Sequence, residues 1–288
     1  MTAHDPGPRV AGVDETVRSY DSVAERYARE FGDELAGKPV DRALYAMFAE
    51  LVVAMEPTGT VGDVGCGPGH VSAHLTTLGL DVVGIDASPG MIATARRAHP
   101  GLRFELGTFA ELPARDGEWA GAVAPYSIIH LDRDGRRTAA NELARAIRTG
   151  GWLLVAFHVS DAEHTAGAVR HVAKWWGHEV DLDFHFLDPA EVTDDLAAAG
   201  FRLVSRTDRE PWPGAEHPSR RTYLLARRDV GCGPGHVSAH LTALGLDVVG
   251  IDASPGMIAT ARRAHPGLRF ELGTFAELPA RDGEWAGA

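Results

Sequence analysis

The sequence is poor in cysteine and has no long apolar run. Its two cysteines, Cys66 and Cys232, occupy equivalent places in two copies of one repeat, so they offer neither a disulfide framework nor metal-ligand spacing. No stretch of about 18 apolar residues occurs, which predicts that no segment spans a membrane. The first eight residues lack a basic region followed by an apolar stretch, so we expect no secretory signal and a cytoplasmic location.

Lysine is also scarce, and the charge balance argues against some partners. Lysine occurs only at Lys38 and Lys174, arginine supplies the other basic side chains, and the net charge is −12. A surface this acidic repels phosphate backbones and anionic lipids, so nucleic acid and membranes are poor candidates. The 288 residues, 44% of them apolar, suffice for one large domain or a domain with an appendage, and we expect a monomer or a homodimer.

A nearly identical internal repeat sets the domain organisation. Residues 63–122 and 229–288 differ at one position, where Thr77 corresponds to Ala243. Such identity indicates a recent duplication or an assembly artefact. The second copy keeps only part of its first strand and stops inside its fourth, and half a sheet with open edges is rarely stable alone. We therefore expect residues 1–228 to form the working domain and the second copy to be non-functional. The alternatives are a swapped element and a second cofactor site.

Strand-like and helix-like segments alternate along the first 228 residues. Five strands are expected at 60–65, 81–86, 102–106, 119–125 and 152–157. Helices are expected at 14–31, about 40–55, about 68–78, from Ser88-Pro89 onward, and about 136–148. After an irregular insert, a capping-box pattern from Asp188 to Glu191 opens the last helix.

This order predicts an α/β fold that is Rossmann-like and doubly wound, with a mostly parallel sheet of seven strands covered on both faces. Segments 201–205 and 222–226 have no helix between them, so we expect an antiparallel hairpin at the sheet edge. The N-terminal helices, within residues 1–58, are expected to form a lid. Residues 159–188 are expected to cover the substrate.

The strongest chemical signal is the segment Asp63-Val64-Gly65-Cys66-Gly67-Pro68-Gly69. Alternate glycines let the backbone turn sharply and approach a ligand. The dinucleotide fingerprint is G-x-G-x-x-G, whereas this loop reads G-x-G-x-G after a carboxylate that would repel a pyrophosphate and suits an ammonium group. A second acid, Asp86, ends the next strand, where it can accept hydrogen bonds from ribose hydroxyls. The two acids fit a ligand with one amino-acid end and one nucleoside end, and they argue against a nicotinamide reductase.

At these residues the sequence resembles the class I S-adenosylmethionine-dependent methyltransferases of the small-molecule type, over residues 14–228. The resemblance implies S-adenosylmethionine as the cofactor and Thr108 at the place of the family's adenine-contacting acid. The cofactor-contacting residues that it implies are Asp63, Gly65, Cys66 and Gly67 at the methionine end, Asp86 and Ala87 at the ribose, Met91, Thr108 and Phe109 at the adenine, Tyr126 beside the methyl group, and Tyr20 and Tyr27 in the lid.

Two histidines are candidate bases. His130 and His158 each follow a strand end on the ligand side, and a base assists methylation of a hydroxyl or amine. Purely structural roles stay open for four of these residues. Met91 can be a core residue, Tyr20 and Tyr27 can form a buried stripe of the helix, and His130 can be a hydrogen-bonded residue of the cavity wall. No metal site is expected, because no tight ligand pair occurs among the clustered histidines at 158, 164, 171, 178 and 185.

The expected function is therefore methylation of a small, partly apolar acceptor, with the acceptor atom (oxygen, nitrogen or carbon) undecided. The sequence lacks an Asn/Asp-Pro-Pro-Tyr motif, which disfavours methylation of a base or amide nitrogen. The alternative from another class is a non-catalytic S-adenosylmethionine-binding regulator or partner subunit. Its sign would be a pocket closed beside the methyl group.

Overall fold

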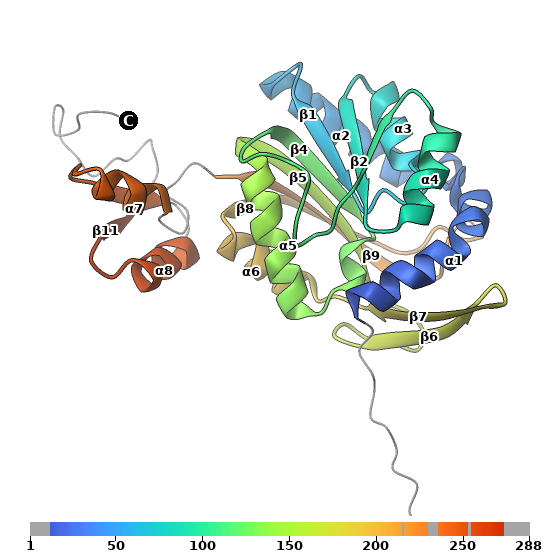
Figure 1. Cartoon of the computed structure of the whole chain (residues 1–288). Coiled ribbons are helices and arrows are strands. Elements are labelled where there is room, and N and C mark those ends of the chain that lie inside the picture. Colours follow the sequence, from blue (N-terminus) through green and yellow to red (C-terminus); the bar gives the residue numbers. More distant parts are fainter. Residues whose placement is uncertain (1–11, 215, 230–235, 253–254, 274–288) are drawn as a thin grey trace, which may run out of the picture.

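The computed structural model describes residues 12–214, 216–229, 236–252 and 255–273 (Figure 1). Within these ranges, no helix is both long and apolar enough to cross a membrane. The first eight residues, on which the expectation of no secretory signal rests, lie outside the described part of the chain.

One sheet of seven strands forms the centre of the fold, in the order β3-β2-β1-β4-β5-β9-β8. The strands are β1 (Thr60–Val64), β2 (Asp81–Asp86), β3 (Arg103–Leu106), β4 (Trp119–Pro125), β5 (Ile147–Ser160), β8 (Phe201–Arg209) and β9 (Arg220–Arg228). The first five are parallel, and β9 runs antiparallel to both β5 and β8. This confirms the predicted Rossmann-like sheet with an antiparallel hairpin at its edge.

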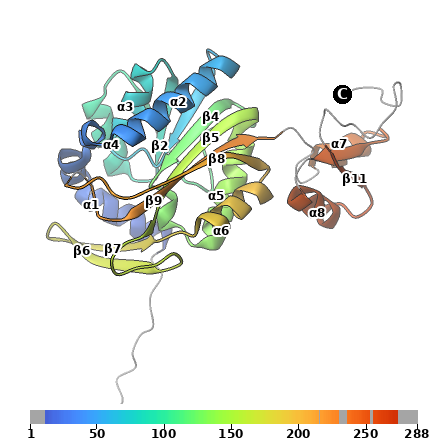
Figure 2. The same ribbon diagram turned by 180° about the vertical axis from the view of Figure 1, so that it is seen from behind.

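Helices cover both faces of the sheet (Figures 1 and 2). They are α1 (Val13–Phe31), α2 (Pro39–Met55), α3 (His70–Thr77), α4 (Pro89–Ala98), α5 (Arg133–Ala146) and α6 (Pro189–Ala198), with short 3-10 turns η1 (Glu34–Gly37) and η2 (Ile128–His130). Alternate residues of β4 face opposite sides: Val123 packs with the apolar side chains of α2 and α3, whereas Ala122 and Ala124 pack with those of α5 and α6. Because both faces are covered, the central strands are mostly apolar, with Asp63 of β1 as a buried exception.

The insert after β5 is more regular than predicted. Residues Val169–Trp175 (β6) and His178–His185 (β7) form an antiparallel hairpin that packs along α1 (Figure 1). Its turn residues, Trp176 and Gly177, both have positive φ, 50° and 88°, as a two-residue hairpin turn of type I′ requires. The expectation of an irregular insert was therefore wrong.

Two local predictions also differ from the structure. Strand β5 begins at Ile147, directly after α5, five residues before the predicted start. Helix α6 begins where predicted, with the Asp188 carboxylate accepting a hydrogen bond from the Ala190 N–H at 2.8 Å. However, the Glu191 side chain is paired with Arg136, so it does not complete the expected capping box.

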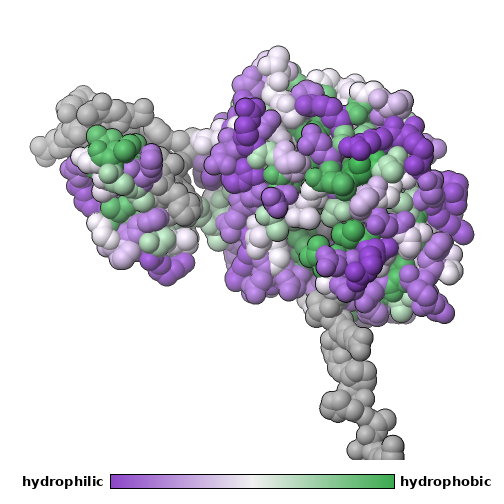
Figure 3. All heavy atoms as spheres, in the orientation of Figure 1, coloured by the Kyte–Doolittle hydropathy of each residue, from purple (hydrophilic) through white to green (hydrophobic). Residues whose placement is uncertain are grey.

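The second copy of the repeat forms α7 (His236–Ala243), β10 (Val249–Asp252), α8 (Pro255–Ala264) and β11 (Arg269–Leu272), with α8 in contact with α6. Strands β10 and β11 pair in the same register as β2 and β3. Its apolar residues are less covered: Leu246 is 53% exposed, whereas its counterpart Leu80 is 5% exposed. Apolar side chains accordingly gather on the visible face of this copy (Figure 3). That the copy is non-functional stays a prediction.

Candidate active site

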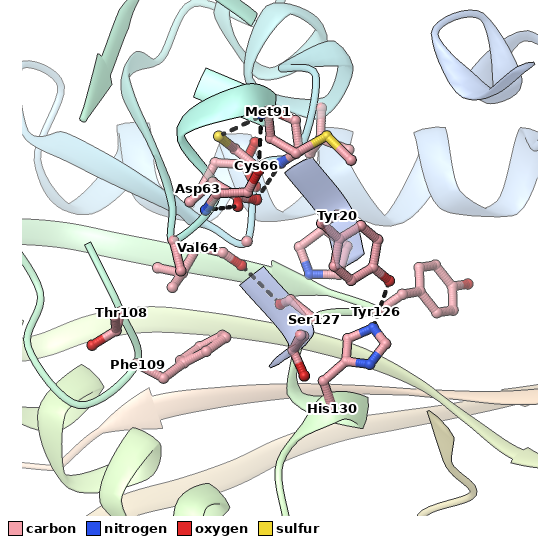
Figure 4. A pocket seen from close by; sticks show the side chains of 18 of the residues that line it. Tyr20, Asp63, Val64, Cys66, Met91, Thr108, Phe109, Tyr126, Ser127 and His130 are labelled. Atoms are coloured by element: carbon pink, nitrogen blue, oxygen red, sulfur yellow. Dashed lines mark hydrogen bonds between the residues drawn. The ribbon is translucent and has the colours of Figure 1, made fainter. Parts of the chain in front are cut away.

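A cavity of about 340 Å³ lies at the carboxyl ends of the central strands (Figure 4). This is where open parallel sheets bind their ligands. All the residues predicted to contact the cofactor line it, and so does His130; His158 is not among its lining residues. Met91 comes from α4, and Tyr20 and Tyr27 come from α1. The lining residues that lie at the carboxyl ends of strands β1 to β4 or in the segments after them include Asp63, Gly65, Cys66, Gly67, Asp86, Ala87, Thr108, Phe109, Tyr126 and His130.

The glycine loop after β1 shapes the floor of the cavity. Gly65 and Gly67 have positive φ, 78° and 53°. A Cβ atom on Gly65 would lie 2.2 Å from the Ser127 Cβ, so only glycine allows the β1 and β4 loops to meet here. A Cβ atom on Gly67 would have no neighbour closer than Tyr27, at 3.9 Å. The backbone at Gly67 therefore borders open space in which a ligand can approach closely.

Asp63 is fully buried, and only one of its two carboxylate oxygens has a hydrogen-bond partner among the described residues. Its Oδ2 accepts a hydrogen bond from the Ser72 hydroxyl at 2.6 Å, whereas Oδ1 has no hydrogen-bond partner among the described residues. Burial raises the pKa of Asp63 to about 6, although the Ser72 hydrogen bond acts in the opposite direction. An unpartnered carboxylate oxygen at a cavity wall is unfavourable unless a cation binds there. The residue thus fits the ammonium group of an amino-acid-like ligand.

Asp86 ties the loops after β1 and β2 together. Its Oδ2 accepts a hydrogen bond from the Gly67 N–H at 2.8 Å, and its Oδ1 accepts one from the Ser88 N–H at 2.9 Å. Each carboxylate oxygen has a second lone pair, so Asp86 retains acceptor capacity toward the cavity for ribose hydroxyls. Burial raises its pKa.

Two further residues border the proposed adenine region. Met91 follows the predicted N-cap Ser88, whose hydroxyl accepts a hydrogen bond from the Met91 N–H at 3.0 Å, and it is buried at the cavity wall. The Thr108 hydroxyl accepts hydrogen bonds from the N–H groups of Ala110 and Glu111, each at 3.2 Å. Thr108 therefore stabilises its own turn, and the neighbouring Phe109 supplies the apolar surface of this wall.

Helix α1 covers the cavity and is fixed on both sides. Toward α4, the Asp21 carboxylate accepts hydrogen bonds from the Ser88 hydroxyl at 2.5 Å and the Gly90 N–H at 2.7 Å. Toward β7, the Ser19 hydroxyl accepts a hydrogen bond from the Asp181 N–H at 2.8 Å. Tyr20 and Tyr27 of this helix line the cavity, as the prediction of an N-terminal lid requires.

The two candidate bases occupy different positions. His130 lines the cavity, and its ring nitrogens lie 2.7 Å from the Tyr20 hydroxyl and 2.9 Å from the Asp183 carbonyl oxygen. His158 lies behind Tyr126, with ring centroids 5.0 Å apart, and its Nδ1 lies 2.7 Å from the Ser219 hydroxyl. Burial lowers the pKa of His130 to about 4 and that of His158 to about 3. Both imidazoles are therefore neutral near pH 7.

Several polar residues of the cavity wall escaped the sequence analysis. Asp41 is 1% exposed and accepts hydrogen bonds from the Tyr223 hydroxyl at 2.9 Å and the Arg209 guanidinium at 2.7 Å. Glu34 also lines the cavity. Burial would raise the pKa of Glu34, but hydrogen bonds from His70 and Lys38 lower it to about 2. The one sequence signal for Asp41 is an acid in the first turn of a mostly apolar helix.

The cavity wall also includes a strained residue. Tyr126 has a φ of 55°, and a bulky residue adopts this conformation only where its surroundings enforce it. Its hydroxyl lies 2.6 Å from that of Tyr223 and 3.3 Å from Asp41 Oδ1. Among the residues that the structure describes, no group of acids, histidines and cysteines has the geometry of a metal site.

Comparison with known proteins identifies a family for this chain. The pattern of a family described as methyltransferase domain matches residues 61–151 and 228–287, more than half of the chain. A demethylmenaquinone methyltransferase of Beutenbergia cavernae is 31% identical over 48% of this chain and 55% of its own length. An O-methyltransferase of Aspergillus nomiae is 29% identical over 65% of this chain and 75% of its own. The chain thus spans little more than half of the first relative.

Solved structures agree on the fold. The complex of DhpI with S-adenosylhomocysteine matches with a TM-score of 0.56 and 23% identity, over 75% of this chain and 96% of that one. The 1,6-didemethyltoxoflavin-N1-methyltransferase of Burkholderia thailandensis matches with a TM-score of 0.54 and 21% identity, over 77% of this chain and 93% of that one. With the sheet order, the glycine loop and the two strand-end acids, the family match shows that this chain belongs to the class I S-adenosylmethionine-dependent methyltransferases.

Proposed function

We propose that this chain transfers a methyl group from S-adenosylmethionine to a small-molecule acceptor. The observation that carries the proposal is the buried, half-satisfied carboxylate of Asp63 at one end of the cavity, with Asp86 at the next strand end. A ligand with an ammonium group and a ribose would satisfy both acids. When bound, S-adenosylmethionine supplies a methyl group on a positively charged sulfur, which is a good leaving group.

The protein's own contribution is mainly alignment and exclusion of water. Residues of helix α1 line the cavity, and the β6–β7 hairpin packs against α1. Hydrogen bonds on both sides of α1, to α4 and to β7, hold this helix in place. His130 is placed to receive a proton, because its ring reaches the cavity wall. We propose a supporting role for His158, which buttresses Tyr126 from behind.

The acceptor is proposed to be small and partly apolar. Beyond the two acids, the cavity continues between α1 and the start of α5, where Val13, Val17 and Leu131 line it. The curated relatives are named for varied small molecules, among them a demethylmenaquinone and trans-aconitate. The continuing cavity favours an enzyme over the non-catalytic binding protein, because a closed pocket would leave no room for an acceptor.

The test is release of S-adenosylhomocysteine from the full chain, supplied with S-adenosylmethionine and a panel of small phenols, quinols and carboxylic acids. We expect product from at least one of these classes and no binding of NADH. Binding of S-adenosylmethionine without turnover across the whole panel would support the non-catalytic alternative. Binding of NADH with no binding of S-adenosylmethionine would contradict both.

A further inference from the structure

Three groups from three separate elements form a hydrogen-bonded line at the cavity wall. The Tyr20 hydroxyl of α1 lies 2.7 Å from Nε2 of His130, which belongs to η2. On its other side, Nδ1 of His130 lies 2.9 Å from the backbone carbonyl oxygen of Asp183 in β7. Figure 4 shows the Tyr20 hydroxyl directed at the imidazole. Both side chains line the cavity.

The chemistry of these partners fixes where the protons are. A carbonyl oxygen only accepts hydrogen bonds, so Nδ1 of His130 must carry a hydrogen. A neutral imidazole has a single N–H, so Nε2 presents a lone pair and the Tyr20 hydroxyl donates to it. Burial keeps His130 neutral by lowering its pKa to about 4, and it raises the pKa of Tyr20 above its usual value. At rest, both groups are therefore uncharged.

This arrangement leaves the lone pair of His130 already occupied. A general base must come within hydrogen-bond distance of the proton that it takes, and the Tyr20 hydroxyl stands at that position. The Tyr20 ring is held by edge contacts, with centroids 5.2 Å from His130, 6.0 Å from Tyr27 and 6.2 Å from Trp175. Moving it aside would break these contacts and the hydrogen bond, whereas passing a proton through it breaks none of the packing.

We propose that Tyr20 is the group that contacts a hydroxyl acceptor and that it relays the acceptor's proton to His130. This inference rests on the proposed methyltransferase function. The acceptor hydroxyl donates its hydrogen to the Tyr20 oxygen, while the Tyr20 hydrogen moves to Nε2 of His130. The electron pair of the acceptor oxygen forms the new bond to the methyl carbon, and the carbon–sulfur bond breaks with its electrons going to sulfur.

The charges balance without any further reactant. His130 gains one positive charge as the charge on the sulfonium sulfur is lost, so the total charge in the buried cavity stays constant. The proton on His130 is later released to water, and Tyr20 ends with the proton that it took from the acceptor. The relay assigns the acceptor to compounds with an un-ionised hydroxyl, because an acceptor that is already ionised has no proton to pass to Tyr20.

The first test does not need an acceptor. Imidazole nitrogen NMR spectra of the full chain, with and without S-adenosylhomocysteine, should show His130 with its hydrogen on Nδ1. The His130→Gln variant identifies its signals. In Tyr20→Phe the tautomer should persist while the Nε2 signal shifts, because that atom loses its donor. A hydrogen on Nε2 in the wild type would overturn the proposal.

The second test compares turnover of Tyr20→Phe, His130→Gln and the double variant on hydroxyl compounds. We expect each to lower kcat by a similar factor, about 10²–10³-fold, with no further loss in the double variant and little change in the KM for S-adenosylmethionine. The control is His178→Gln, which replaces an exposed histidine in β7, the strand that also contains Asp183. This variant should retain full activity.

The outcomes separate this inference from the proposed function. If the wild type is active and Tyr20→Phe retains or exceeds its activity, Tyr20 merely moves aside and the relay fails alone. If the wild type binds S-adenosylmethionine and methylates nothing, the proposed function fails and the relay fails with it. Additive losses in the double variant would also contradict the relay, because the two residues would then act separately.

Discussion

Asp63→Asn is expected to weaken S-adenosylmethionine binding by about a hundredfold or more, because removing one member of a buried charge pair costs about 2–5 kcal/mol. The asparagine side chain would remain close in shape but lack the negative charge that the ammonium group requires. The Ser72 hydroxyl, which donates to this carboxylate at 2.6 Å, would still find an acceptor in the amide. The loss should therefore appear in binding and not in folding.

The same substitution should stabilise the ligand-free protein at pH 8. The folded-state pKa of Asp63 is raised to about 6, whereas an unfolded aspartate has a pKa of about 3.9. The protonated carboxyl therefore favours folding below about pH 4, and this contribution is lost as the pH rises through 6. Asparagine stays neutral throughout, so the variant should gain about 3 kcal/mol at pH 8.

The matched control is Asp229→Asn in the second copy. Asp229 corresponds to Asp63 by sequence, but it forms an ion pair with Arg202 at 3.3 Å instead of facing the cavity. Titration calorimetry should show binding unchanged in this variant, and denaturant unfolding at pH 5 and pH 8 gives the stability comparison. Equal binding by Asp63→Asn and the wild type would remove Asp63 from the cofactor site.

Glu216→Ala should cause the largest loss of stability, about 3–5 kcal/mol in the free energy of unfolding. The Glu216 side chain is 1% exposed and pairs with Arg209 at 2.5 Å and with Arg221 at 3.0 Å. Arg221 is itself only 2% exposed, so the substitution would leave a buried guanidinium without its carboxylate. Arg221 also lies over the ring of Tyr126, 5.8 Å from its centroid, so the cavity wall should loosen as well.

Glu210→Ala is the comparison for this effect. Glu210 belongs to the same connection between β8 and β9, but its pair with Arg220 is exposed on both sides, 71% and 59%. Such pairs contribute about 0–1 kcal/mol. Urea unfolding of both variants measures the difference. Similar losses from the two substitutions would mean that the buried cluster is not a stabilising network.

The residues predicted to contact the cofactor all line the cavity, because their placement depends on local rules. Their contact with the cofactor stays a prediction. Asp63 and Asp86 end neighbouring parallel strands, and such strand ends meet at one edge of a sheet. His158 also follows a strand end, yet it lies behind Tyr126. Whether a side chain at a strand end faces the ligand or the layer behind it depends on residues far away in the sequence. For His158, one such residue is its hydrogen-bond partner Ser219.

Other features depend on tertiary structure alone. Arg209 and Asp41 are 168 residues apart, and nothing local indicates that they pair. The β6–β7 hairpin had a signal in the alternation of Val180, Leu182 and Phe184, but its Trp176-Gly177 turn lacks the usual Asn-Gly. The repeat also shows that burial depends on tertiary structure. Leu80 and Leu246 have the same adjacent residues in sequence, but their exposed fractions are 5% and 53%.

The most direct measurement is calorimetric titration of S-adenosylmethionine into the full chain and into a chain ending at Asp229, with Asp63→Asn in parallel. The cavity described above is built from residues 13–138, so the account predicts one binding site of equal affinity in both chains and its loss in the variant. Two sites in the full chain, loss of binding on truncation, or no binding at all would contradict the assignment of the cofactor site to the first copy.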